Sequence, residues 1–359
     1  MISSHPEWAS YREAPINGNW FQKWLKSRFR FVDYPFLLAY RGMGSEQTWF
    51  IQGHVFKGMA LRSPRKNATL WQNVVSMLKM FMVRTVEGAR VELCFQGHGF
   101  ITETDAQGFF EFRIEPKQLP QGWQSYELKL LDEVVEGQEE VSVQSEALIA
   151  YDFEYGLISD IDDTFLVTHV TNKLRKLYTL LTNDFESRKP VEGVVQFYQA
   201  LCDGVTQRSN PFFYVSSSEW NLYEFLVNFT QTHNLPKGVF QLKEIKDQFM
   251  DFFRSGYGSH DHKRKKIERI LRLYPERSFI MLGDNGQHDP QIYAEVAQQY
   301  PQQIKAVYIR GVKKGHWPQT EAQLTLIRAH SIPALQFEHS REAFEHAQEQ
   351  GFIEAKSLV

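Results

Sequence analysis

Three aspartates follow an apolar segment near the middle of the chain. In LISDIDDTF, the run of apolar residues leads into Asp160, Asp162 and Asp163, and Thr164 closes the turn. Carboxylates crowded at the end of a buried strand repel one another unless a cation neutralises them. The pattern therefore predicts a divalent metal site. The simpler alternative is a solvated acidic turn or a helix N-cap, which accounts for one aspartate better than for three.

Serine hydroxyls and a lysine form a second group that suits phosphate chemistry. In FFYVSSSEW, an apolar segment leads into Ser216 and Ser217 before an expected helix. Hydroxyl and amide donors at a helix start suit a phosphate, because the donors and the helix dipole point the same way. Lys263, in HKRKKIERIL, offers a cation for the same anion. The ordinary alternatives are serines that cap a helix and a solvated lysine.

A second acidic pair follows another apolar segment. In SFIMLGDNGQHDP, Gly283 allows a tight turn, and Asp284 and Asp289 come after it. Carboxylate oxygens are the ligands that hard divalent cations prefer. If this segment is a strand beside the one that ends at Asp160, its carboxylates reach the same site. A surface turn is the alternative interpretation.

The elements that must position these residues are parallel strands. After Ala150, short apolar runs alternate with helical stretches, a pattern typical of βαβ units in an α/β fold. The expected strands are Tyr155–Ser159, Phe212–Val215, Gly238–Leu242, Phe279–Leu282 and Ile304–Ile309, with helices at Leu222–Thr232 and Lys263–Leu273. In a doubly wound sheet the carboxyl ends of such strands converge on one crevice. The chemistry is therefore expected there.

The first 150 residues follow a different pattern. Over residues 46–150, apolar and polar residues alternate between glycine-rich turns, which predicts a small β-sandwich with a helix inserted over residues 70–83. Residues 1–45 form a separate segment whose stretch NWFQKWLKSRFRF at 19–31 mixes aromatic and basic residues. This stretch either lies at an anionic bilayer surface or packs its aromatic side chains against the β domain.

In order along the chain, DIDDT, SSS, HK and GDNGQHD resemble the haloacid-dehalogenase-like phosphatase superfamily. The longer stretches YGLISDIDDTF, FYVSSSEWNLYEFL, HKRKKIERIL and LGDNGQHDPQIYAEV resemble the actin-patch type of phosphatidate phosphatase and its bacterial relatives, over residues 152–312. The resemblance extends more loosely to RGMGSEQTWFIQGHVF and TDAQGFF. It implies a Rossmann-like haloacid-dehalogenase parallel sheet over residues 151–359. The span 167–190 is too short for more than a minimal cap.

This resemblance assigns roles to the aspartates. It implies that Asp160 is the nucleophile and forms an aspartyl-phosphate, and that Asp162 is the general acid that later acts as base. It implies a magnesium ion held by Asp160, Asp162, Asp284 and Asp289. The superfamily often has glycine where this chain has Asp163, but the narrower family is expected to have aspartate there.

The resemblance also assigns the residues around the phosphate. Ser216 matches the position that hydrogen-bonds the phosphoryl group, with Ser217 as the alternative on the substrate side, and Thr164 supports the same loop. Lys263 matches the lysine that neutralises the phosphoryl oxygens. Two further lysines, Lys265 and Lys266, lie close enough in sequence to compete for that assignment.

Composition limits the choice of partners. The net charge of -3 gives no overall reason to bind nucleic acid, and two cysteines, Cys94 and Cys202, offer neither a disulfide framework nor a CxxC site. No signal-peptide pattern and no apolar run of about 18 residues occurs, so we expect a cytoplasmic protein that is at most peripheral to a membrane. Three hypotheses follow: a phosphatidate phosphatase, a phosphatase for soluble phosphomonoesters, and a non-catalytic binding module.

Overall fold

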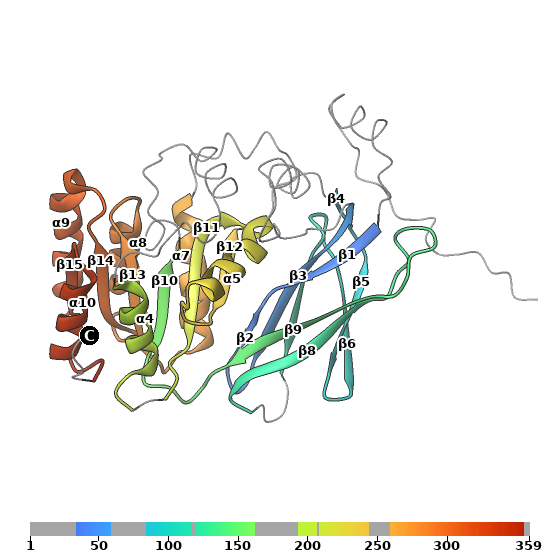
Figure 1. Cartoon of the computed structure of the whole chain (residues 1–359), viewed down its shortest axis with the longest axis horizontal. Helices are drawn as coiled ribbons and strands as arrows, with labels where there is room; N and C mark the ends of the chain where they lie inside the picture. Colours follow the sequence, from blue (N-terminus) through green and yellow to red (C-terminus); the bar gives the residue numbers. More distant parts are fainter. Residues whose placement is uncertain are drawn as a thin grey trace, which may run out of the picture. The chain divides into compact units, whose positions relative to one another are not determined.

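The computed structural model describes residues 34–58, 84–115, 120–161, 193–206, 208–243 and 259–354 (Figure 1). Among these, contacts divide the chain into two compact units. A β-rich unit contains residues 34–42, 49–58, 84–115 and 123–147. The second unit contains residues 43–48, 120–122 and the described residues from 148 onward. The domain limits expected at residues 45 and 150 stay predictions.

The first half of the described chain consists of strands. They are β1 (Tyr34–Ala39), β2 (Gly42–Gly44), β3 (Trp49–Gly58), β4 (Arg84–Thr85), β5 (Arg90–Phe95), β6 (His98–Glu103), β7 (Phe109–Ile114), β8 (Gly122–Leu130) and β9 (Val141–Ile149). Alternating burial along β5 and β7 fits strands that turn one face to a core. The core includes Trp49 and His54, both fully buried.

The hydrogen bonds join these strands into one sheet in the order β1-β3-β2-β9-β8-β5-β6, with β4 and β7 also paired to β3. The alternating pattern noted over residues 46–150 does form strands, among them β3, β8 and β9. The β-sandwich packing stays a prediction. The helix expected over residues 70–83 and the stretch 19–31 lie outside the described residues.

The second unit has an α/β fold, as expected. Its strands are β10 (Gly156–Asp160), β11 (Phe212–Glu219), β12 (Val239–Lys243), β13 (Phe279–Asp284), β14 (Ile304–Arg310) and β15 (Ala334–Phe337). They pair in parallel in the order β12-β11-β10-β13-β14-β15. Every residue of β10 and β13 is buried, because helices cover both faces of a parallel sheet.

Helices connect these strands (Figure 1). They are α4 (Val194–Asp203), α5 (Tyr223–Thr232), α7 (Ser259–Leu273), α8 (Asp289–Gln299), α9 (Trp317–Arg328) and α10 (Ser340–Glu349), with short 3-10 turns η3 (Trp220–Leu222) and η4 (Lys314–His316). From β10 the chain adds β11 and then β12 on one side of the sheet. It then crosses back and adds β13, β14 and β15 on the other side of β10. Right-handed connections place α4 and α5 on one face and α7, α8 and α9 on the other.

All five strands expected in this unit are confirmed, with small shifts at their ends. The sixth strand, β15, was not expected. Helix α7 begins four residues before the expected Lys263. Strand β11 continues four residues past Val215, to Glu219. In the described part of the chain, no helix has the length and apolar character needed to span a bilayer.

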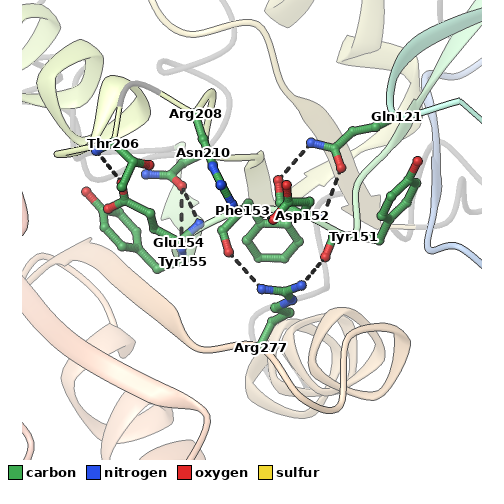
Figure 2. Close-up of polar contacts among 10 residues, drawn as sticks. All are labelled: Gln121, Tyr151, Asp152, Phe153, Glu154, Tyr155, Thr206, Arg208, Asn210 and Arg277. Carbon is green, nitrogen blue, oxygen red and sulfur yellow. Dashed lines mark hydrogen bonds and ion pairs between the residues drawn. The ribbon is translucent and has the colours of Figure 1, made fainter.

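The segment before β10 is fixed by side chains from three other parts of this unit (Figure 2). The Arg277 guanidinium donates to the carbonyls of Tyr151 and Phe153 and lies over the Phe153 ring. Gln121 bonds to both the amide and the carbonyl of Asp152, at 2.8 and 2.7 Å. The buried Asn210 carboxamide closes the segment, because its Oδ1 accepts from the amides of residues 154 and 155. The amino end of β10 is thereby held in one place.

Candidate active site

The carboxyl ends of β10 and β13 bring two aspartates together. Asp160 is the last residue of β10, and Asp284 is the last of β13. The two strands are neighbours, and Ser159 pairs with Leu282, so Asp284 lies one residue further along than Asp160. Both side chains are buried, with exposed fractions of 2% and 1%. The site lies where the strand order reverses direction, the usual position for a ligand in an open α/β sheet.

A lysine and a third aspartate reach the same place from two helices. Lys263 comes from the second turn of α7, and its Nζ donates to Asp160 Oδ1 at 2.7 Å. The same ammonium forms a second short ion pair, with Asp289 Oδ1. Asp289 is the first residue of α8, where a helix N-terminus favours a negative charge. Lys263 therefore joins the nucleophile predicted in β10 to the acidic start of α8.

The turn after β13 is built around a glycine. A Cβ on Gly283 would lie 2.7 Å from Asp289 Oδ2 and 2.9 Å from the Tyr293 ring, so a larger residue would displace the carboxylate. The amide of Asp284 donates to Asp289 Oδ2 at 3.3 Å, and Asp284 Oδ1 accepts from the Gly286 amide at 2.5 Å. Glycine at position 283 thus lets two carboxylates approach each other.

Burial and charge act in opposite directions on Lys263. Burial alone lowers the pKa of its ammonium, but Asp160 and Asp289 together outweigh that effect, and the net pKa is raised above its usual value. The lysine therefore stays positively charged in the folded protein. On the other face of β10, burial raises the pKa of the Tyr198 phenol, whose Oη lies 3.1 Å from Ser159 Oγ. This phenol stays neutral.

The donor set suits a hard divalent cation. Asp160, Asp284 and Asp289 each offer a carboxylate oxygen, and these three atoms lie within 4.8 Å of one another. Three buried carboxylates face one ammonium group, with Arg310 across from Asp284 on the neighbouring strand. Oxygen-only donors with excess negative charge are the environment that Mg²⁺ favours. These residues fit the ion that the sequence implied.

The remaining predicted residues have different outcomes. Asp162, Asp163, Thr164 and the span 167–190 lie outside the described residues, as does the side chain of Ser217. In the HKRKK run, the lysine that bonds to Asp160 is Lys263, whereas Lys265 is exposed.

The prediction that the serines stand at a helix start is wrong. Ser216 is a buried residue inside β11, and helix α5 begins only at Tyr223, with Leu222 as its N-cap. The strand continues because polar residues can follow the apolar run without breaking the extended backbone. Val215 pairs with Asp160, so Ser216 lies one residue beyond the level of Asp160. A helix dipole therefore contributes nothing at Ser216.

Sequence reasoning missed Asn285, which is buried directly after Asp284. Its Oδ1 accepts from the amides of Val312 and Lys313, both at 2.8 Å, and its Nδ2 donates to the Lys313 carbonyl at 3.0 Å. An asparagine in a turn often replaces backbone hydrogen bonds in this way. The GDN sequence was the available signal, but its partner residues lie far along the chain.

Comparison with known proteins shows what the second unit is similar to. Residues 155–311 match the family described as phosphatidate phosphatase APP1, catalytic domain. The chain is 33% identical over 213 residues to phosphatidate phosphatase APP1 of Saccharomyces cerevisiae, covering 59% of this chain and 34% of that protein. Residues 155–311 are therefore similar to the catalytic domain of the actin-patch-type phosphatidate phosphatases.

A second relative is an uncharacterized protein of Schizosaccharomyces pombe. It is 28% identical over 178 residues, covering 49% of this chain and 28% of that protein. The chain thus spans about a third of the length of the curated relatives it matches. The match to a solved carbohydrate acetylesterase from Xanthomonas citri covers 91% of this chain and 77% of that protein's chain. Its sequence identity is 10% and its TM-score is 0.30, so this match supports no conclusion.

Proposed function

We propose that this chain is a phosphomonoester hydrolase that converts phosphatidate to diacylglycerol and phosphate. The observation that carries the proposal is the contact of Lys263 with Asp160, at the point of the sheet where Asp284 and Asp289 also meet. Four charged side chains from two strands and two helices converge on one place. A non-catalytic module would have no reason to bury them, since burying charged groups is costly.

The proposed reaction begins with an attack by Asp160 on phosphorus. A carboxylate oxygen forms a bond to phosphorus, the ester oxygen leaves with the bonding pair, and Asp162 gives that oxygen a proton. Water then attacks the aspartyl-phosphate, Asp162 takes the proton from water, and the bond between Asp160 and phosphorus breaks. The role of Asp162 follows from the family resemblance. Dividing hydrolysis into two displacements lowers the barrier of each.

The other residues of the site position the reacting groups. Lys263 fixes one oxygen of Asp160 and presents positive charge to the phosphoryl oxygens. Asp289 holds Lys263 through its Oδ1 and the turn at Asp284 through its Oδ2. Ser216 is proposed to donate to the phosphoryl group. Asp160, Asp284 and Asp289, with Asp162 by resemblance, would hold Mg²⁺, which when bound supplies positive charge to the transferring phosphoryl group.

The fold and setting of this enzyme are part of the same proposal. We assign the second unit to the haloacid-dehalogenase-like fold with a minimal cap, because its central strands and helix α7 carry the ordered motifs of that superfamily. An open site of this kind admits a bulky lipid. The protein is proposed to be cytoplasmic, with peripheral contact to a membrane that presents the substrate.

A substrate panel tests the proposal. Phosphate release is measured from phosphatidate in detergent micelles and from p-nitrophenyl phosphate, with Mg²⁺ and with a chelator. We expect release from phosphatidate that requires Mg²⁺ and is lost in Asp160→Asn. The matched control is Asp203→Asn, an exposed aspartate at the end of α4, which keeps activity. Turnover of p-nitrophenyl phosphate alone would point to soluble substrates, and no turnover of either would indicate a binding module.

A further inference from the structure

A short basic loop follows β14, at the same edge of the sheet as the candidate active site. It comprises Gly311–Lys313 and the 3-10 turn η4. Strand β14 pairs with β13, and Arg310 at the end of β14 is opposite Asp284. The loop therefore begins beside a proposed metal ligand. None of its residues has been assigned a role in the reaction proposed above.

The loop is fixed to the turn that carries Asp284. Besides the three bonds made by the Asn285 carboxamide, the Asn285 carbonyl accepts from His316 Nδ1 at 2.7 Å. Lys313 Nζ donates to the Gly286 carbonyl at 2.6 Å, and the Asn285 amide donates to the Arg310 carbonyl at 2.9 Å. A loop held by this many bonds keeps one shape, so whatever it binds is held at a defined place relative to the site.

The chemistry of the loop is unusual for its length. Residues 310–317, RGVKKGHW, contain three basic residues and a histidine but no acidic residue. Lys314 is 86% exposed, and Val312, an apolar residue two positions earlier in the chain, is 41% exposed. The carboxylate of Glu338 lies 3.8 Å from Lys314 Nζ and is itself half exposed. Such an exposed pair contributes little, so the loop presents positive charge to solvent.

We propose that this loop, residues 311–316, docks on an anionic phospholipid surface, with Lys314 and Val312 as its contacts. Basic residues are attracted to anionic head groups, and an exposed apolar side chain between them can enter the interfacial region. Soluble anions would be bound by the charges but would give the exposed valine no role. The inference rests on the proposed lipid substrate and deepens it, because docking at this edge would bring the site to the membrane.

Vesicle co-sedimentation tests the inference without turnover. Vesicles of phosphatidylcholine alone are compared with vesicles that also contain phosphatidylglycerol, a phosphodiester that the proposed reaction does not hydrolyse. The full chain is expected to sediment only with the anionic vesicles, and less at high salt, where charge is screened. Lys314→Glu and Val312→Asp should each weaken binding at least about fivefold, whereas Glu338→Gln should strengthen it.

Matched controls lie away from the loop, near the amino ends of the strands. Lys237→Glu replaces an exposed lysine before β12, and Leu326→Asp replaces an exposed leucine near the end of α9. Both should bind the anionic vesicles like the native chain, and thermal unfolding of all variants shows whether they fold. Equal binding by the native chain and the loop variants, or no binding by the native chain, would overturn the docking inference.

The same preparations separate this inference from the proposed function. If the native chain releases phosphate from p-nitrophenyl phosphate but does not sediment with anionic vesicles, the docking inference is wrong and the phosphatase proposal stands. If it sediments through the loop but hydrolyses neither substrate, docking is supported and the phosphatase proposal is wrong.

Discussion

At the scale of single residues, the site depends on one buried ammonium group. Lys263 pairs with Asp160 and Asp289, and all three side chains are at most 5% exposed. The two carboxylates raise the pKa of Lys263 above its unfolded value, so the pairing stabilises the fold fully below about pH 10.4 and is lost only as pH rises through the folded pKa. The charge is therefore present throughout the neutral range.

Replacing this lysine should affect stability and activity together. Lys263→Met leaves buried carboxylates without their cation, and we expect the free energy of unfolding to fall by about 3 kcal/mol in chelator. Adding Mg²⁺ should restore more stability to the variant than it gives the native chain. Phosphate release should fall at least about 100-fold. Urea unfolding and phosphate release measure the two effects.

The control for this lysine lies two residues away on the same helix. Lys265→Met removes an exposed ammonium from α7 and should change stability by less than about 0.5 kcal/mol. If Lys263→Met and Lys265→Met behaved alike in both assays, the central position of Lys263 would be refuted.

The position of single residues could be predicted from sequence where a motif stands at a strand end. Asp160 and Asp284 follow apolar runs, so their convergence could be expected from the parallel sheet alone. The helix-start interpretation of Ser216 failed because sequence did not show that β11 continues through the serines. The GDN sequence did not show what Asn285 bonds to, because its partners are backbone atoms 27 and 28 residues later.

At the scale of elements, strand β10 has to deliver Asp160 accurately. Its amino end is held by Asn210, whose Nδ2 donates to the Leu201 carbonyl at 3.0 Å while its Oδ1 accepts from two amides of the segment before β10 (Figure 2). Apolar runs predicted the strand itself. The asparagine that anchors the strand lies more than 50 residues away. It stands between α4 and β11, where no periodic pattern of apolar residues could indicate its position.

Removing this anchor should destabilise the unit without touching the chemistry. Asn210→Ala leaves buried backbone groups without partners, and we expect a loss of about 2 kcal/mol in the free energy of unfolding. Hydrogen exchange of the β10 amides, followed in urea, reports this loss locally. The neighbouring change Arg208→Gln breaks only an exposed ion pair with Asp152, and should cost less than about 0.5 kcal/mol. Equal losses in the two variants would contradict the anchoring role.

At the scale of the whole molecule, sequence predicted the class of the second unit and five of its six described strands, because parallel strands covered on both faces are apolar throughout. The short β15 is only partly buried, so its apolar signal is weak. The order of the strands could not be read from the apolar runs. That order is what places Asp160 at the switch point.

The β-rich unit carries a buried histidine. His54 is fully buried. Its Nδ1 is hydrogen-bonded to the Tyr40 hydroxyl at 2.8 Å, and its ring stacks on that of Phe56. Burial lowers its pKa to about 3. Below pH 6.5 the unfolded chain therefore binds a proton that the folded unit does not, and stability falls as pH falls toward 3.

This histidine gives a pH-dependent prediction for the β-rich unit. Between pH 7 and pH 5 the native chain should lose about 2 kcal/mol more than His54→Phe, which has no proton to bind at that position. Urea unfolding of both chains at the two pH values gives the comparison, and titration of other groups cancels in the difference. Parallel losses in the two chains would show that His54 does not control the pH dependence.

The most direct measurement of the central claim is detection of the phosphoryl group on Asp160. The native chain is mixed with phosphatidate and Mg²⁺, quenched in acid during turnover, digested, and analysed by mass spectrometry. We predict phosphate on the peptide that contains Asp160, absent when Mg²⁺ is chelated. Phosphate release without any modified Asp160 peptide, or release at the native rate from Asp160→Asn, would contradict the account.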